Sequence, residues 1–253
     1  MAASPRLFLD ALAHWVETTP DKTCSTFLSD SGSPVASLTF KQLDLRTAQI
    51  AQHLAGLGLA KGDRCLLVFE PSLGFIVSFI ACLKAQIIAV PVFPPDPLKK
   101  AVDLTMFATI AGNCGALTAL TSSVYNNGKK LAAVKSMFSK DGAKWPELNW
   151  VVVDDIPSSS APARQRPSSS ASLQDISFLQ YTSGSTSDPK GVMISHENLA
   201  HNLSCIIDEL KAGSDTVVVS WLPQYHDMGL IGVRRFAPFL QRPCMRVEMG
   251  YIA

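Results

Sequence analysis

Apolar positions recur along the chain first at helical spacing and then as short continuous runs. Residues 7–16 carry an apolar side chain every three or four positions and Pro20 follows soon after, so this stretch predicts a helix. Residues 64–69 and 87–93 are short apolar runs that predict buried strands, and residues 72–85 between them predict a helix. A strand, a helix and a second strand in this order indicate a parallel βαβ unit.

The rest of the chain continues this alternation of helices and strands. Helices are expected over residues 40–57, 98–114 and 131–138 and from about Ser195, with Thr39 and Ser195 as helix caps. Strands are expected over residues 116–120, 150–153 and 176–181, and a buried strand over residues 216–222. Residues 156–172 are rich in Ser, Pro and Ala without an apolar period, which predicts a linker or loop. We therefore expect an α/β fold with a first subdomain at residues 1–155, this loop, and a further segment at residues 173–253.

The composition limits the classes of function. Of 253 residues, 47% are hydrophobic, and the formal net charge is +1, so there is no basic excess for binding nucleic acid. The longest apolar stretch, residues 75–93, contains Lys84 and Gln86, so it predicts a buried helix and strand and no membrane span. The first residues lack the basic lead and long apolar run of a signal peptide, which favours a cytoplasmic protein.

The cysteines and histidines do not follow a metal-binding pattern. Six cysteines are scattered without a Cys-x-x-Cys pair, so we expect reduced, mostly buried thiols. His196 and Glu197 begin like the zinc-protease motif HExxH, but Ala200 stands where the second His is required. His201 lies one position too far along a helix to share a metal with His196. We therefore expect no metal site here.

Residues 181–192 read YTSGSTSDPKGV and directly follow a predicted buried strand. Small side chains let backbone N–H groups approach an anion, hydroxyls add donors, and Lys190 adds a compact positive charge. The segment is not a Walker A loop, because Lys190 is followed by Gly191 and not by Ser or Thr. A surface turn is the alternative, but the position after a buried strand favours a triphosphate-binding loop. The candidate ligands are Thr182, Ser183, Gly184, Ser185, Thr186 and Lys190.

This loop resembles the signature phosphate loop of the adenylate-forming superfamily of ligases and synthetases. Most members have Gly where this chain has Ser187, but Ser is frequent there in the fatty acyl-AMP ligases. Two further blocks are similar to fatty acyl-AMP ligases, namely WLPQYHDMGLIG at residues 221–232 and AVPVFPPDP at residues 89–97. The chain is therefore identified as a member of this superfamily, most similar to the fatty acyl-AMP ligases.

The resemblance implies a fold, a reaction and a set of partners. The fold would be part of the large amino-terminal domain, with βαβ units and mixed sheets. The reaction would use ATP and Mg²⁺ to convert a fatty acid to acyl-AMP, with an acyl carrier protein or a polyketide synthase as the acceptor of the acyl group. His226 would lie near the acyl carboxylate and the α-phosphate, although a His next to an Asp is by itself more often a structural pair.

The resemblance also implies catalytic blocks that this sequence does not contain. Family members supply a magnesium ligand, a ribose-binding Asp and a catalytic Lys from later in the chain, and we find none of them here. We therefore expect the chain to stop before the active site is complete and to be an incomplete or inactive fragment. The alternatives are an acyl-CoA synthetase and a non-catalytic adenylation-like binding module.

Overall fold

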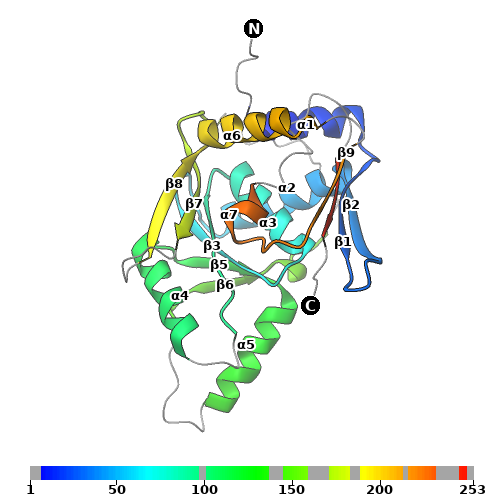
Figure 1. Ribbon diagram of the computed structural model, residues 1–253. Helices are drawn as coiled ribbons and strands as arrows, with labels where there is room; N and C mark the ends of the chain where they lie inside the picture. The colour runs from blue at the N-terminus through cyan, green and yellow to red at the C-terminus, as the bar shows by residue number, and fades with distance from the viewer. Residues whose placement is uncertain are drawn as a thin grey trace.

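Two β-sheets with helices packed against them make up the structure (Figure 1). The computed structural model describes residues 7–96, 101–136, 145–158, 171–182, 189–212, 216–231 and 245–249. Across the six-stranded sheet the strands are β6 (Asn149–Val152), β5 (Thr118–Thr121), β3 (Arg64–Val68), β4 (Ile88–Pro91), β7 (Ile176–Thr182) and β8 (Lys190–Ser195). Across the four-stranded sheet they are β2 (Pro34–Thr39), β1 (Thr23–Leu28), β10 (Met245–Met249) and β9 (Thr216–Ser220).

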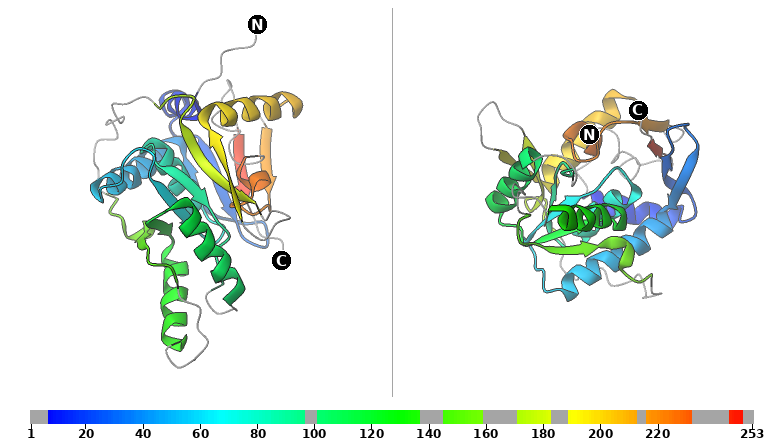
Figure 2. Two further views of the ribbon diagram at one scale, coloured as in Figure 1. Left: turned by 90° about the vertical axis from the view of Figure 1, so that its left-hand side faces the viewer. Right: turned by 90° about the horizontal axis from the view of Figure 1, so that it is seen from below.

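The helices cover the sheets and lie between them. They are α1 (Phe8–Thr18), α2 (Phe40–Gly56), α3 (Leu73–Lys84), α4 (Ala101–Cys114), α5 (Ser123–Ser136), α6 (His196–Glu209) and α7 (Asp227–Leu230), with a 3-10 turn η1 at Val153–Asp155. Helix α3 packs on β3 and β4 and also contacts β1 of the other sheet. In Figures 1 and 2, α4 and α5 lie at the opposite end of the molecule from α1 and α6.

The predicted βαβ unit is confirmed, because β3 and β4 are parallel neighbours joined through α3. Strands β5 and β6 continue the parallel sheet on one side, and β7 joins it on the other through the pair Ala89 and Phe178. Strand β8 is antiparallel and completes a hairpin with β7. The carboxyl ends of five parallel strands therefore lie at one edge of the sheet. The subdomain boundaries proposed from the sequence stay a prediction, although both sides of residues 156–172 supply strands to each sheet.

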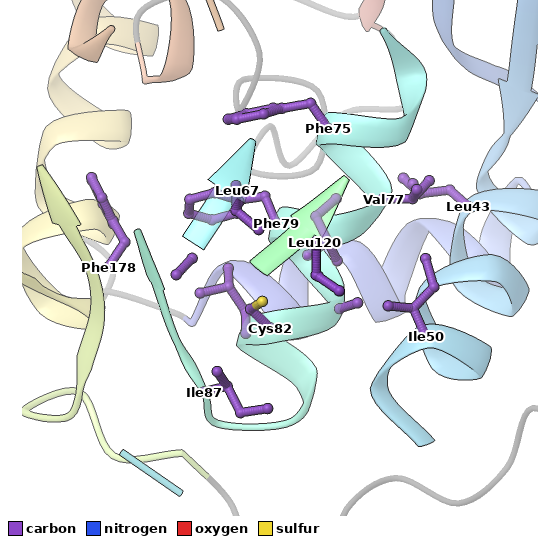
Figure 3. Close-up of a cluster of buried hydrophobic side chains, with 14 of the residues drawn as sticks. Leu43, Ile50, Leu67, Phe75, Val77, Phe79, Cys82, Ile87, Leu120 and Phe178 are labelled. Atoms are coloured by element: carbon purple, nitrogen blue, oxygen red, sulfur yellow. The ribbon is translucent and has the colours of Figure 1, made fainter. Parts of the chain in front are cut away.

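Strand β3 is buried on both faces, which explains its nearly unbroken apolar run. Side chains alternate between the faces of a strand, and so Leu67 belongs to one hydrophobic cluster while Leu66 and Val68 belong to another. Figure 3 shows Leu67 beside Phe79 of α3, and Phe178 of β7 approaches from the opposite side. The rings of Phe79 and Phe178 are 5.6 Å apart, which joins β7 to the core of the βαβ unit.

Two predicted helix starts have the expected cap. The Thr39 hydroxyl accepts a hydrogen bond from the Gln42 N–H of α2, and the Gln42 side chain accepts one in return from the Thr39 N–H. Ser195 and Asn198 repeat this capping box at α6. Ser72 also stands at the N-cap of α3, but its hydroxyl donates to the Glu70 carbonyl and leaves the helix amides to other partners.

Several elements differ from the prediction. Strands β1, β2, β8 and β10 were not expected, although residues 245–249 read MRVEM and alternate apolar with charged residues, which is a strand pattern. Helix α5 begins at Ser123, well before the predicted residue 131. Strand β9 was expected to be buried, yet Val217 and Val219 are 53% and 56% exposed, so their hydrophobicity did not indicate their environment.

Most cysteines of the described residues are buried, as expected, and Cys244 lies outside the described residues. Cys24, Cys65, Cys82 and Cys114 are buried, whereas Cys205 on α6 is exposed. Burial raises the pKa of the Cys24 thiol to about 12, so this group stays protonated at neutral pH. The described part of the chain contains no helix of the length and hydrophobicity needed to span a membrane.

Phe178→Ala should lower the free energy of unfolding by about 3–5 kcal/mol, because it removes a fully buried ring between β7 and α3. Val217→Ala, at an exposed apolar position of β9, should change it by less than about 0.5 kcal/mol. Urea denaturation followed by circular dichroism measures both values. Equal losses for the two variants would contradict the packing described here.

The ion pair before β7 should give a pH-dependent contribution to stability. The Lys61 Nζ donates to Asp175 Oδ2 at 2.6 Å, and this bond, followed by one from the Ser172 N–H, lowers the pKa of Asp175. The stabilisation is therefore complete above the pKa of an unfolded Asp, about 3.9, and is lost as the pH falls through the lower folded value. Asp175→Asn should destabilise the protein at pH 7, and the difference from wild type should shrink toward pH 3. The control Asp30→Asn, at an exposed turn position, should change the free energy of unfolding at pH 7 by less than about 0.5 kcal/mol.

Candidate functional site

The segments that follow three parallel strands lie at the carboxyl edge of the sheet. Ser72 follows β3, Phe93 follows β4 in the Pro-rich block, and Thr182 ends β7 at the start of the phosphate loop. Ligands of open α/β sheets bind outside the carboxyl ends of the strands, because the loops there are arranged by the rigid ladder beneath them. The sheet therefore directs the Pro-rich block and the loop to one edge.

The β7–β8 hairpin fixes the two ends of the predicted phosphate loop. Thr182 and Lys190 are register partners, so they face each other across the hairpin. Both are exposed, and Pro189 between the loop and Lys190 is buried. The other candidate ligands, Ser183, Gly184, Ser185 and Thr186, lie outside the described residues. The structure thus brings Thr182 and Lys190 together at the ends of the loop.

Tyr181 and Gly191 form a close cross-strand pair directly below the loop. A Cβ atom on Gly191 would lie 2.8 Å from the Tyr181 ring, a separation that real Cβ atoms essentially never show. The Tyr181 hydroxyl donates to the Asn113 side-chain oxygen of α4, which holds the ring over the glycine. No sequence pattern indicated this contact between Gly191 and Tyr181.

His226 lies on an exposed turn before α7. Its Nδ1 is 2.6 Å from Asp227 Oδ1, and the same carboxylate oxygen accepts a hydrogen bond from the Met228 N–H. Because Nδ1 engages the carboxylate, Nε2 is the ring nitrogen that can face a ligand. Met228 is 62% exposed, so it does not belong to the core of the described structure. The adjacent carboxylate orients the imidazole, as in a structural pair, and leaves one ring nitrogen available.

The His226 turn is in contact with the other two blocks. The Gln180 side-chain N–H₂ of β7, two residues before Thr182, donates to the Tyr225 carbonyl at 3.1 Å. The Tyr225 ring meets the Phe93 ring of the Pro-rich block edge to face, with centroids 5.4 Å apart. All three blocks singled out in the sequence are therefore joined at this edge, although they are far apart along the chain.

Acidic groups also lie near this edge. The Tyr125 hydroxyl of α5 donates to the Pro95 carbonyl at 2.6 Å. Burial raises the pKa of Tyr125, and the negative charges of Glu70 and Asp96 raise it further, so the phenol stays neutral. Within the described residues, no group of three or more His, Cys, Asp or Glu side chains is placed to hold a metal ion.

Comparisons with known proteins agree with the resemblance found in the sequence. The profile of the AMP-binding enzyme family matches residues 12–238. The medium-chain fatty acid–acyl-carrier-protein ligase JamA of Moorena producens is 34% identical over 81% of this chain and 33% of its own. The long-chain fatty acid–AMP ligase FadD26 of Mycobacterium tuberculosis is 35% identical over 91% of this chain and 39% of its own. The chain thus spans 33–39% of the length of these relatives.

Solved structures give the same result. A fatty acyl-adenylate ligase from L. pneumophila, in complex with acyl adenylate and pyrophosphate, has a TM-score of 0.80 and 32% identity to this chain. The match covers 96% of this chain and 39% of that protein. A fatty acid AMP ligase from the same species has a TM-score of 0.81 at the same identity. The arrangement described above is therefore also found in adenylate-forming ligases.

Gly191→Ala should destabilise the β7–β8 hairpin, because its new methyl group collides with the Tyr181 ring. We expect a loss of about 1–3 kcal/mol in the free energy of unfolding. The same change in a Tyr181→Ala background should cost much less, since the ring that it meets is gone. A double-mutant cycle by urea denaturation measures the coupling. Equal losses in the two backgrounds would show that the close contact does not restrict residue 191.

Proposed function

Because this chain belongs to the AMP-binding enzyme family, we propose that it carries the phosphate-binding part of a fatty acid-activating ligase. In the proposed reaction, a carboxylate oxygen of the fatty acid attacks the α-phosphorus of ATP and forms the carboxylic–phosphoric mixed anhydride bond of acyl-AMP. The bond between the α-phosphorus and the bridging oxygen breaks, and pyrophosphate leaves with the electron pair.

One observation supports this proposal above all others. The phosphate-loop hairpin and the His226 turn are joined at the carboxyl edge of the sheet by the hydrogen bond from Gln180 to the Tyr225 carbonyl. A fatty acid-activating enzyme needs a triphosphate site and a site for the reacting carboxylate next to each other, because catalysis of this reaction depends on positioning. Relatives above 30% identity named as fatty acid ligases support the same substrate class.

The proposed roles follow from the chemistry of the side chains. Thr182, Ser183, Ser185 and Thr186 would donate hydroxyl hydrogen bonds to the phosphates, Gly184 would let the backbone approach them, and Lys190 would contribute positive charge. His226 would donate from Nε2 to the negative charge that develops at the α-phosphate and the acyl carboxylate. These groups act by electrostatic stabilisation and orientation, and none of them forms a covalent bond to the substrate.

The acceptor of the acyl group is proposed from the name of a relative, and the metal is proposed from the chemistry of ATP. JamA is named for transfer to an acyl carrier protein, and we propose an acyl carrier protein or a polyketide synthase as the acceptor here. ATP is expected to bind with Mg²⁺, but the described residues lack a metal-binding cluster, so no step is assigned to a protein-bound metal. Formation of acyl-CoA in the presence of coenzyme A would identify an acyl-CoA synthetase instead.

A nucleotide-binding module without catalytic activity is the second candidate. It would use the same phosphate-loop hairpin, and the family match does not separate it from the enzyme. ATP–pyrophosphate exchange that depends on added fatty acid would identify the enzyme. Binding of ATP without exchange would identify the module. Both candidates require the phosphate loop to bind ATP.

Lys190→Ala should weaken ATP binding by about tenfold or more, since it removes a charge-assisted hydrogen bond worth about 1.5–3 kcal/mol. The matched control is Lys41→Ala, which removes an exposed lysine at the start of α2 and should leave the affinity unchanged. Isothermal titration calorimetry on the folded chain measures both. Equal affinities for wild type and Lys190→Ala, or no ATP binding by folded wild type, would refute the proposed phosphate site.

A further inference from the structure

Gln224 is a buried polar residue whose whole side-chain amide is paired with one backbone position. It is only 2% exposed. The Ser72 N–H donates to Gln224 Oε1 at 2.9 Å, and Gln224 Nε2 donates back to the Ser72 carbonyl at 2.9 Å. The side chain therefore pairs with Ser72 as a neighbouring backbone would, and it gives the Ser72 N–H an acceptor at the junction of β3 and α3.

The next residue is held by two other strands. Tyr225 accepts the hydrogen bond from Gln180 of β7 through its carbonyl, and its ring packs on Phe93 after β4. Gln224 and Tyr225 together thus connect one short segment to the ends of β3, β4 and β7. Because these strands are fixed in register by the parallel ladder, the segment has little freedom to shift.

The turn that follows is compact. The Pro223 carbonyl accepts from the His226 N–H at 3.2 Å, and the His226 carbonyl accepts from the Leu230 N–H at 2.8 Å. A Cβ atom on Gly229 would lie 2.0 Å from the Pro223 oxygen, so only glycine fits where α7 meets the start of the turn. Leu230 is buried and joins the main hydrophobic cluster. A displacement of residue 224 is therefore transmitted to His226, two positions away.

We infer that Gln224 is a positioning residue, which holds the His226 turn against the carboxyl end of β3 beside the phosphate loop. This inference rests on the proposed function, in which His226 faces the acyl-adenylate. Two bonds in opposite directions require a neutral group that donates and accepts, so an ionised Glu cannot replace Gln here. Glu keeps an acceptor for the Ser72 N–H but loses the donor for the Ser72 carbonyl and introduces a buried charge.

The experiment compares Gln224→Met and Gln224→Glu with wild type. Gln49→Met is the matched control, because Gln49 is also a buried glutamine with a polar contact, from Arg46 of α2, remote from the edge in sequence. Amide hydrogen exchange reports the order of the turn through the N–H groups of Leu230 and Ile231. Titration with acyl-sulfamoyl-adenosine, a stable mimic of the acyl-adenylate, measures binding at the proposed acyl-adenylate site. Titration with inorganic tripolyphosphate measures binding at the proposed phosphate site.

Both Gln224 variants should accelerate exchange at Leu230 and Ile231 while the protection of β3 and β4 is kept. They should weaken binding of the acyl-adenylate mimic about tenfold and change tripolyphosphate binding less than twofold. Gln224→Met should add little to the effect of His226→Ala on the mimic, because both changes act through the same group. Gln49→Met should lower global stability without selective effects on the turn or the mimic.

Three results would overturn the inference: unchanged exchange in the turn, equal losses for the two ligands, or additive effects of Gln224→Met and His226→Ala. Failure of both Gln224 variants to fold would also overturn it, since Gln224 would then support the whole fold and not the turn. If folded wild type binds neither ligand, the proposed function fails. Hydrogen exchange then still decides whether Gln224 orders the turn.

Discussion

The parallel ladder of β3, β4 and β7 is the constraint on which the rest of the site depends. Its register places the ends of three strands at one edge, and each strand end leads into a segment that contacts the same short turn. The ladder is in turn held by a core that fills both of its faces. Loss of the pairing between β4 and β7 would separate the phosphate-loop hairpin from the His226 turn, even if both segments kept their local structure.

The local elements of this ladder were predictable from the sequence. The apolar runs of β3 and β4, the helix between them and the caps at Thr39 and Ser195 are signals carried by neighbouring residues, and all of them were confirmed. Strand β8 was missed because it begins with Lys190 and Gly191 and exposes Val192 and Met193, so it lacks the pattern of a buried strand. Strand β9 was predicted correctly as a strand, but the prediction that it is buried was wrong. An apolar run does not reveal which other elements cover it.

The residues of the candidate site also include some that the sequence predicted and one that it did not. Residue types and order were enough to propose Lys190 and His226, because a phosphate loop and a histidine in a matched block are visible in the sequence. Gln224 was not visible as a functional residue, because its partner Ser72 is 152 positions away and its amide chemistry resembles that of any polar residue. Contacts of this kind depend on the register of the sheet, and only a three-dimensional structure reveals them.

The central claim is that the phosphate-loop hairpin and the His226 turn form one ligand site. Its most direct test is an NMR titration of the folded chain with the acyl-adenylate mimic, following the amide signals of residues 190–192 and 225–231. We expect the signals of both segments to shift with one common dissociation constant, while the signals of β5 and β6 stay in place. Shifts in only one segment, or saturation of the two segments at different ligand concentrations, would contradict it.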